Sequence, residues 1–321
     1  MKRVSETTSS SMRPGRRPGR LGVGVIGAGR VGAVLASALR QAGHAVVGAT
    51  AVSAASRERV EVMLPGVPVL EVADVVERSE LVLVTVPDDA LADLVAGVAA
   101  TQGWRPGQLV AHTSGRHGIA VLDPALRQGA IPLALHPAMT FSGTSLDLTR
   151  LTDCCFGVTA PGPVLPVAQA LVVEMGAEPV VVPEQARGLY HAALAHGSNH
   201  LVTLVAQALD LLSEAGIEEP ARVLGPLLHA SLDNALRRGD LALTGPVARG
   251  DAGTVAAHLR VLAEVEAGGG AADVLAAYRA MARATAERAI ASGGLQAEAA
   301  QALLAALADR PGAPGASAGE R

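Results

Sequence analysis

The sequence has almost no lysine and few aromatic residues. Lys2 is the single lysine among 26 basic residues, and it lies at the start of the 321-residue chain. A reaction that needs a lysine as a Schiff base, a P-loop ligand or a general acid is therefore close to excluded. Aromatic residues make up 2% of the chain, which is too few for a surface on which nucleic-acid bases stack.

The sequence also lacks long apolar runs and a strong positive charge. No stretch approaches 18 uninterrupted apolar residues, so we expect no transmembrane helix. Residues 1–20 hold six basic residues against one acidic residue, which leaves the rest more acidic than the net charge of −4. An acidic body argues against nucleic acid as the main partner. The basic start lacks the apolar region of a secretory signal, and we expect residues 1–20 to form a disordered leader.

Cysteine is limited to one adjacent pair, Cys154 and Cys155, in the strand-like run CCFGV. Neighbouring cysteines form a disulfide only with strain. We therefore expect two buried free thiols in a reducing compartment, which predicts a cytoplasmic protein.

Strand and helix patterns alternate from residue 21 onward. Near-continuous apolar runs predict strands over residues 21–26, 44–52, 67–70, 81–86, 109–114, 131–136 and 154–158. Short helices between such strands indicate an α/β fold with a doubly wound, mostly parallel Rossmann-like sheet over residues 21–160. The pattern then becomes helical, apart from a short strand over 179–182. It predicts an all-helical domain over residues 161–310, with a flexible tail over 311–321. A predicted helix of about thirty residues, 184–215, is long for a globular domain, and such a helix is typical of the spine of an all-helical domain or of a homodimer interface.

A glycine-rich loop, GVIGAGRVG, follows the first predicted strand and begins the first predicted helix. In this setting Gly27 permits a tight turn, Gly29 lets the backbone approach a pyrophosphate, and Gly32 allows close packing of helix on sheet. The helix N-terminus adds free N–H groups and a favourable dipole. We expect a dinucleotide to bind the loop residues Gly27, Ala28, Gly29, Arg30, Val31 and Gly32.

The end of the second predicted strand favours one dinucleotide over the other. An NAD site normally has an acidic residue about 20 residues after the loop, but none lies between His44 and Arg57. Ser53, Ser56 and Arg57 stand there instead. Hydroxyls and a guanidinium suit a 2′-phosphate, and Arg30 adds a second charge. We therefore expect NADP as the cofactor, with NAD as the alternative.

Polar residues also follow the later strands, where ligands of doubly wound sheets bind. Val86, Pro87 and Asp88 are expected beside the cofactor ribose. Ser114, in a turn that presents N–H groups, is expected beside the nicotinamide, and His136 beside the substrate. For a histidine at a strand end, a purely structural hydrogen bond is the alternative.

The long predicted helix carries a second group of candidates. On a helical wheel Tyr190 belongs to an apolar stripe, His191 lies at its border, and Asn199 lies about 80° further round. His191 and Asn199 can therefore share one site. His196 and His200 fall on the opposite, polar side, and without a third ligand we expect no metal site.

The motifs GVIGAGRVG, VTVPDDAL, HTSG, LALHPAMTFSG, SNHLVTL and LTGPVARGD together resemble a family of Rossmann-like proteins with a C-terminal domain of unknown function. The wider superfamily is similar to ketopantoate, pyrroline-5-carboxylate, prephenate and hydroxyisobutyrate enzymes. The resemblance covers about residues 21–300. It implies a dinucleotide domain, a helical domain, NADP-linked hydride transfer and a dimer. Some members similar to this chain are regarded as alternative ketopantoate reductases in pantothenate synthesis.

The sequence departs from this superfamily at one position. Ketopantoate reductases and hydroxyisobutyrate dehydrogenases have a lysine one turn before the asparagine, whereas Ala195 stands there in this chain and Asn199 matches the asparagine. His191, one further turn back, is the best candidate proton donor, because the ordinary pKa of an imidazole suits a general acid at neutral pH.

These patterns predict an NADP-dependent oxidoreductase that acts on a small 2-oxo acid. His191 would protonate the developing alkoxide, and Asn199 would orient the carbonyl. Arg249 is expected to bind the substrate carboxylate, with Thr244 nearby; a salt bridge to Asp251 is the alternative for Arg249. Two other functions stay open, namely a prephenate- or pyrroline-type dehydrogenase and a non-catalytic NADP sensor.

Overall fold

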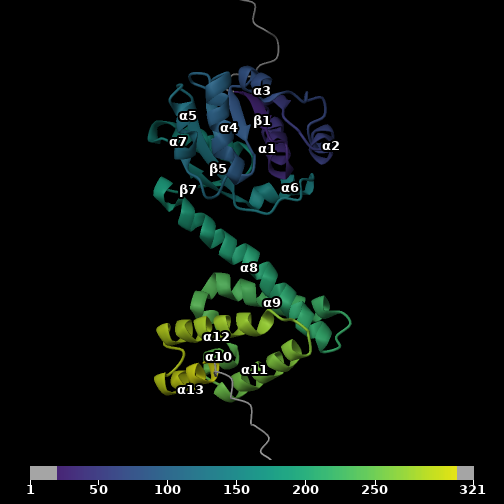
Figure 1. Ribbon diagram of the computed structural model, residues 1–321. Coiled ribbons are helices and arrows are strands. Elements are labelled where there is room, and N and C mark those ends of the chain that lie inside the picture. The colour runs from purple at the N-terminus through teal and green to yellow at the C-terminus, as the bar shows by residue number, and fades with distance from the viewer. Residues whose placement is uncertain (1–19, 309–321) are drawn as a thin grey trace, which may run out of the picture. The chain divides into compact units, whose positions relative to one another are not determined.

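The computed structural model describes residues 20–308, so the expected leader and tail lie almost entirely outside the described residues. A seven-stranded sheet with the order β2-β1-β3-β4-β5-β6-β7 forms the first part of the chain (Figure 1). Its strands are β1 (Gly22–Ile26), β2 (Ala45–Ala49), β3 (Leu81–Val84), β4 (Leu109–His112), β5 (Ile131–Pro137), β6 (Cys155–Thr159) and β7 (Glu178–Val181). All neighbouring pairs are parallel except β5 and β6. The mostly parallel sheet is confirmed.

Helices cover both faces of this sheet, which explains the apolar character of its strands. Every residue of β1, β3 and β4 is buried, as expected when neither face meets water. One face packs on α1 (Arg30–Gln41), α2 (Ala54–Met63), α6 (Leu146–Arg150) and α7 (Leu165–Glu174). The other face packs on α3 (Val72–Arg78), α4 (Asp88–Thr101) and α5 (Asp123–Leu126). The fold is therefore doubly wound.

The structure differs from the sequence expectations at the sheet edges. The strand expected over residues 67–70 is reduced to one bridge, between Ala49 and Val69. The short strand expected near 179–182 joins the sheet as β7, and α7 packs beside it. Contacts therefore divide the chain between Gly197 and Ser198, further along than the boundary expected near residue 160.

The two cysteines differ in their surroundings. Cys154 is a buried free thiol, and burial raises its pKa to about 11. Cys155 is free but exposed, which corrects the expectation that both are buried. Cys155 is the exposed first residue of β6, and the other four residues of that strand are buried.

The second unit is helical. It holds the C-terminal part of α8 (Arg187–Glu214) and the helices α9 (Pro220–Arg238), α10 (Gly245–Arg249), α11 (Ala252–Ala267), α12 (Val274–Ala291) and α13 (Ala297–Leu307). Its core lies between α11, α12 and α13, around Val255, Ala286 and Leu303.

The fold also contains short 3-10 turns in both units, at Ile119–Leu122, Leu151–Asp153, Gly162–Val164, Glu184–Ala186 and Gly239–Ala242. Between residues 20 and 308, no helix combines the length and hydropathy that crossing a bilayer requires.

Candidate functional site

The loop between β1 and α1 is held by two threonines from neighbouring strands. Gly27 has a φ of +90°, which favours glycine, and a Cβ there would lie 3.0 Å from the Thr85 carbonyl oxygen. The Gly27 N–H donates to the Thr50 Oγ1 at 2.8 Å. The Thr85 Oγ1 donates to the Gly27 carbonyl oxygen at 2.7 Å. The loop is thus shaped before any ligand arrives, and neither threonine is among the residues expected from the sequence.

The other two loop glycines have the environments expected of a dinucleotide-binding loop: Gly32 is tightly packed and Gly29 is open. A Cβ at Gly32 would lie 2.3 Å from the Thr85 Oγ1 and 2.7 Å from the Gly27 carbonyl oxygen, so only glycine packs there. A Cβ at Gly29 would meet nothing closer than 3.8 Å, so this backbone is open to a ligand. Ala28 is buried, and its N–H donates to the Thr50 carbonyl oxygen.

The start of α1 provides free donors at this open side. Gly29 is the N-cap residue and offers no side-chain hydrogen bond to the helix. The N–H groups of Arg30, Val31 and Gly32 have no intrahelical acceptor, because they lie in the first turn. Together with the helix dipole they fit a pyrophosphate.

The hydroxyls expected at the 2′-phosphate already have partners in the protein. Ser53 caps α2, and its Oγ accepts a hydrogen bond from the Ser56 N–H at 3.1 Å. The Ser56 Oγ donates to the Ser53 carbonyl oxygen at 2.7 Å, and the Arg57 Nε donates to the Ala51 carbonyl oxygen at 3.3 Å. These groups build the start of α2, where the side chains of Ser53 and Arg57 are exposed.

A second arginine joins Arg30 at Gly143, in the loop after β5. A Cβ at Gly143 would lie 2.7 Å from the Arg59 Nε and 3.0 Å from the Arg30 Cγ. The fully buried Asp147 carboxylate holds this loop by accepting from the Gly143 N–H at 2.7 Å and the Ser142 Oγ at 2.9 Å. The Arg59 guanidinium and the aliphatic part of the Arg30 side chain therefore flank one glycine beside the α1 N-terminus. Arg59 is not among the residues expected from the sequence, and its position two residues after Arg57 puts it on a different face of α2.

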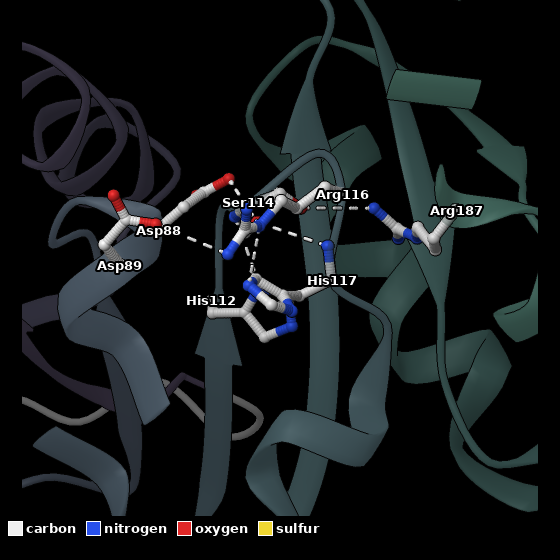
Figure 2. Close-up of polar contacts among 7 residues, drawn as sticks. All are labelled: Asp88, Asp89, His112, Ser114, Arg116, His117 and Arg187. Carbon is white, nitrogen blue, oxygen red and sulfur yellow. Dashed lines mark hydrogen bonds and ion pairs between the residues drawn. The ribbon is translucent and has the colours of Figure 1, made fainter. Parts of the chain in front are cut away.

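The loops after β3 and β4 are joined by a polar network (Figure 2). Val86 and Pro87 lead from β3 to α4, which begins with Asp88 and Asp89. The Arg116 Nη2 lies 3.4 Å from the Asp89 Oδ1, and its Nε lies 3.8 Å from the Asp88 Oδ2. Such pairs at the surface contribute at most about 1 kcal/mol, so they position the loop weakly.

His112 and Ser114 form the inner part of this network. The His112 Nε2 lies 2.9 Å from the Gly118 carbonyl oxygen, and its Nδ1 accepts from the Ser114 N–H at 3.2 Å. Burial lowers the pKa of His112 to about 4, so the ring is neutral. The Ser114 N–H, which the turn was expected to present to a ligand, is therefore used inside the protein. Its Oγ accepts from the His117 N–H at 3.3 Å.

A separate cluster unites β5 with the first two turns of α8. The His136 Nδ1 lies 2.9 Å from the Tyr190 hydroxyl, and the two rings meet edge to face at 89°. The rings of His136 and His191 are 6.0 Å apart at 83°. A Cβ at Gly115 would lie 2.5 Å from the His191 Cδ2 and 2.9 Å from the His136 Nε2. The structure thus brings together His136 and His191, which were expected from separate motifs.

Arg187 lies beneath this cluster and is 1% exposed. Its guanidinium donates to the Thr159 Oγ1 at 2.8 Å and to the carbonyl oxygens of Gly157, Ala134 and Ser114 at 2.9, 3.0 and 3.4 Å. Figure 2 shows it reaching toward Ser114. Burial lowers the pKa of this group, but an arginine remains charged in proteins. Nothing in the sequence distinguishes Arg187 from an exposed arginine at a helix start.

The remaining expected residues belong to the second unit. Asn199 is exposed on α8, and its carbonyl oxygen accepts from the Thr203 Oγ1 at 3.5 Å. Thr244 is the N-cap residue of α10, and Arg249 is its last residue and exposed. Asp251, the alternative partner of Arg249, caps α11 by accepting from the Thr254 N–H at 3.0 Å.

Comparison with solved structures finds the same fold. A candidate NADP oxidoreductase from Bacteroides fragilis shares 23% identity with a TM-score of 0.68, over 84% of this chain and 98% of that one. An imine reductase from Pseudomonas sp. shares 17% identity with a TM-score of 0.64, over 90% and 100%. Pyrroline carboxylate reductase from Plasmodium falciparum, with NADP bound, shares 12% identity with a TM-score of 0.54, over 83% and 98%.

No curated protein matches the sequence. Models of protein families, in contrast, cover most of the chain. Residues 4–137 match the model of a Rossmann-like domain, and residues 154–285 match the domain of unknown function DUF2520. The chain therefore belongs to the proteins that pair a Rossmann-like domain with a C-terminal DUF2520 domain.

Proposed function

We propose that the protein is an NADP-dependent oxidoreductase that reduces the carbonyl group of a small 2-oxo acid. The open backbone at Gly29, with Arg30 and Arg59 beside it, carries this proposal, because it fits a phosphorylated dinucleotide. The named functions of the similar structures support the same reaction class.

The residues of the first unit divide between cofactor and substrate. Gly27, Gly29 and the α1 N-terminus hold the pyrophosphate. Arg30, Arg57 and Arg59 bind the 2′-phosphate, whereas the hydroxyls of Ser53 and Ser56, which were expected there, hold the start of α2 instead. Val86, Pro87, Asp88 and Ser114 line the ribose and nicotinamide side. NADPH, when bound, supplies the hydride.

The chain's own residues manage the proton and the substrate. His191 holds a proton for the oxygen of the substrate carbonyl and acts as the general acid, and His136 lies beside it. The substrate contacts expected of Asn199, Arg249 and Thr244, which all lie in the second unit, stay predictions from the sequence. The two free thiols fit a reducing compartment such as the cytoplasm.

A turnover assay tests this reaction. The purified protein with NADPH is offered ketopantoate, other 2-oxo acids and prephenate, and also cyclic imines, since imine and pyrroline carboxylate reductases share the fold. We expect oxidation of NADPH with at least one 2-oxo acid. Turnover of imines alone would favour the pyrroline-type reaction, and binding without any turnover would favour a sensor.

Arg59 is expected to decide between NADPH and NADH. Removing one charge-assisted contact to the 2′-phosphate costs about 1.5–3 kcal/mol, so Arg59→Gln should weaken NADPH binding by at least about tenfold. NADH binding should not change. Calorimetric titration of both cofactors measures this, with Arg127→Gln as control, because Arg127 is exposed and precedes the amino end of β5, whereas Arg59 contacts the loop after its carboxyl end. Equal weakening of both cofactors would contradict a phosphate contact.

The helical unit is proposed to form a homodimer. Every residue of α9 is at least partly exposed, although the helix is rich in leucine. Val223, Leu227, Leu232 and Leu236 are between 48% and 80% exposed. An apolar surface of this kind is typical of a protein interface.

The dimer is tested by charging this helix. We expect the unmodified protein to have a dimer's mass by light scattering, and the double variant Leu232→Arg, Leu236→Arg to have a monomer's. Leu126→Arg, at a side chain that is also 48% exposed but lies on α5, should remain a dimer. A monomeric unmodified protein would contradict the proposal.

A further inference from the structure

We propose that His136 is a fixed, neutral hydrogen-bond donor whose Nε2–H serves the substrate oxygen beside His191, and that Tyr190 and Arg187 are the residues that position it. This rests on the proposed function for the identity of the acceptor. It adds to the general acid a second group with a different task, and it gives a role to a tyrosine and an arginine that the reaction does not otherwise use.

The contact with Tyr190 selects one tautomer of the ring. The Tyr190 hydroxyl lies 2.9 Å from the His136 Nδ1. A phenol is a much stronger acid than a neutral imidazole N–H, and an imidazole nitrogen is a good acceptor, so the phenol donates. Burial raises the pKa of this phenol, while the charge of Arg187 and the Gly157 backbone act against that rise. The ring proton of His136 therefore lies on Nε2.

The Nε2 edge of the ring faces His191. Gly115 borders both rings, because a Cβ there would lie 2.9 Å from the His136 Nε2 and 2.5 Å from the His191 Cδ2. Gly115 therefore packs directly against both rings, and any larger residue would displace one of them. The rings meet edge to face with centroids 6.0 Å apart. One substrate oxygen can therefore be shared between the two imidazoles.

Arg187 fixes the backbone on which His136 stands. It binds the carbonyl oxygen of Ala134, two residues earlier in β5, and that of Gly157, the residue paired with His136 in β6. It also binds the Ser114 carbonyl oxygen, next to Gly115. A buried cation with such neutral acceptors is a poor way to stabilise a core, since an apolar side chain of similar size often does better. The arrangement favours a role at the site.

The charge of Arg187 has a second effect on the ring. Burial, then Arg187, then His191 lower the pKa of His136 to about 4, against a small opposing effect of Asp88. The ring is therefore uncharged at neutral pH. A neutral imidazole can polarise a carbonyl and stabilise the developing negative oxygen without losing its proton. The proton itself then comes from His191.

Nitrogen NMR of the histidine side chains tests the proposal on the complete protein without cofactor. We expect the His136 ring to be neutral at neutral pH with its proton on Nε2, the signals being assigned with His136→Gln. In Tyr190→Phe we expect a mixture of both tautomers and up to about a hundredfold lower kcat, the loss typical for one donor. Arg187→Met should raise the pH at which the His136 ring titrates. If Arg187→Met does not fold, Tyr190→Phe still tests the proposal.

The chain contains a matched control for this experiment. Tyr278 makes the same contact with the His258 Nδ1 at 2.8 Å, but in the second unit, between a partly buried tyrosine and an exposed histidine. Tyr278→Phe should leave the His136 signals unchanged. A His136 proton on Nδ1, a charged ring at neutral pH, or an unchanged ring in Tyr190→Phe would overturn the proposal. These signals do not depend on turnover, so an inactive protein with the expected tautomer would refute the proposed function alone.

Discussion

Replacing Gly29 by valine is expected to abolish NADPH binding while the protein keeps its fold. Gly29 has a φ of −77°, which any residue adopts, and a Cβ there would meet nothing within 3.8 Å. The protein itself therefore has room for the side chain, at an N-cap cost of about 1 kcal/mol. The pyrophosphate needs the same space, because it must approach the backbone closely. Calorimetric titration with NADPH measures the loss, and thermal unfolding measures the stability.

Gly32→Ala is the matched control. Unlike Gly29→Val, it should lower the thermal stability of the protein. Its Cβ would lie 2.3 Å from the Thr85 Oγ1 and 2.7 Å from the Gly27 carbonyl oxygen. Overpacking of this kind costs about 1–3 kcal/mol, so the melting temperature should fall clearly. If Gly29→Val binds NADPH as tightly as the unmodified protein, the pyrophosphate does not lie on this loop.

Removing the imidazole of His191 is expected to lower kcat by about 10²–10⁴-fold, the usual contribution of a general acid. The affinity for NADPH should not change, because His191 lies beside His136 and Gly115 rather than at the glycine loop. His191→Ala is compared with the unmodified protein in steady-state turnover of the best 2-oxo acid. Cofactor titration of the same samples separates binding from chemistry.

A second histidine variant guards against a general effect of losing an imidazole. His229 is exposed on α9, and its Nδ1 lies 2.8 Å from the Gly225 carbonyl oxygen of the same helix. His229→Ala should keep full turnover. If His191→Ala also keeps it, another group supplies the proton and the assignment of His191 is wrong.

Much of the fold follows from local patterns that tertiary contacts do not overturn. The apolar runs of β1, β3 and β4 are buried on both faces, and the glycine spacing fits the contacts of Gly29 and Gly32. The direction of β6 was not predictable. The 17 residues between β5 and β6 are long enough for a parallel crossover, yet they hold only the short α6 and one 3-10 turn and return the chain antiparallel.

The candidate site shows the same limit at the level of side chains. His136 and His191 were found because strand ends and helix faces have simple geometric rules. Tyr190 was taken as part of an apolar stripe, since periodicity reports the face of a helix and not a hydrogen bond to a residue 54 positions away. Arg187 and Arg59 have their roles through contacts with Gly157 and Gly143, which only the folded chain brings near.

The most direct test of a phosphate-binding dinucleotide site is a calorimetric titration of the unmodified protein with NADPH and with NADH. Two arginines, Arg30 and Arg59, lie beside the glycine loop and should favour the phosphorylated cofactor. We predict that NADPH binds at least about tenfold more tightly, a difference of about 1.4 kcal/mol. Equal or tighter binding of NADH, or no binding of either cofactor, would contradict the account.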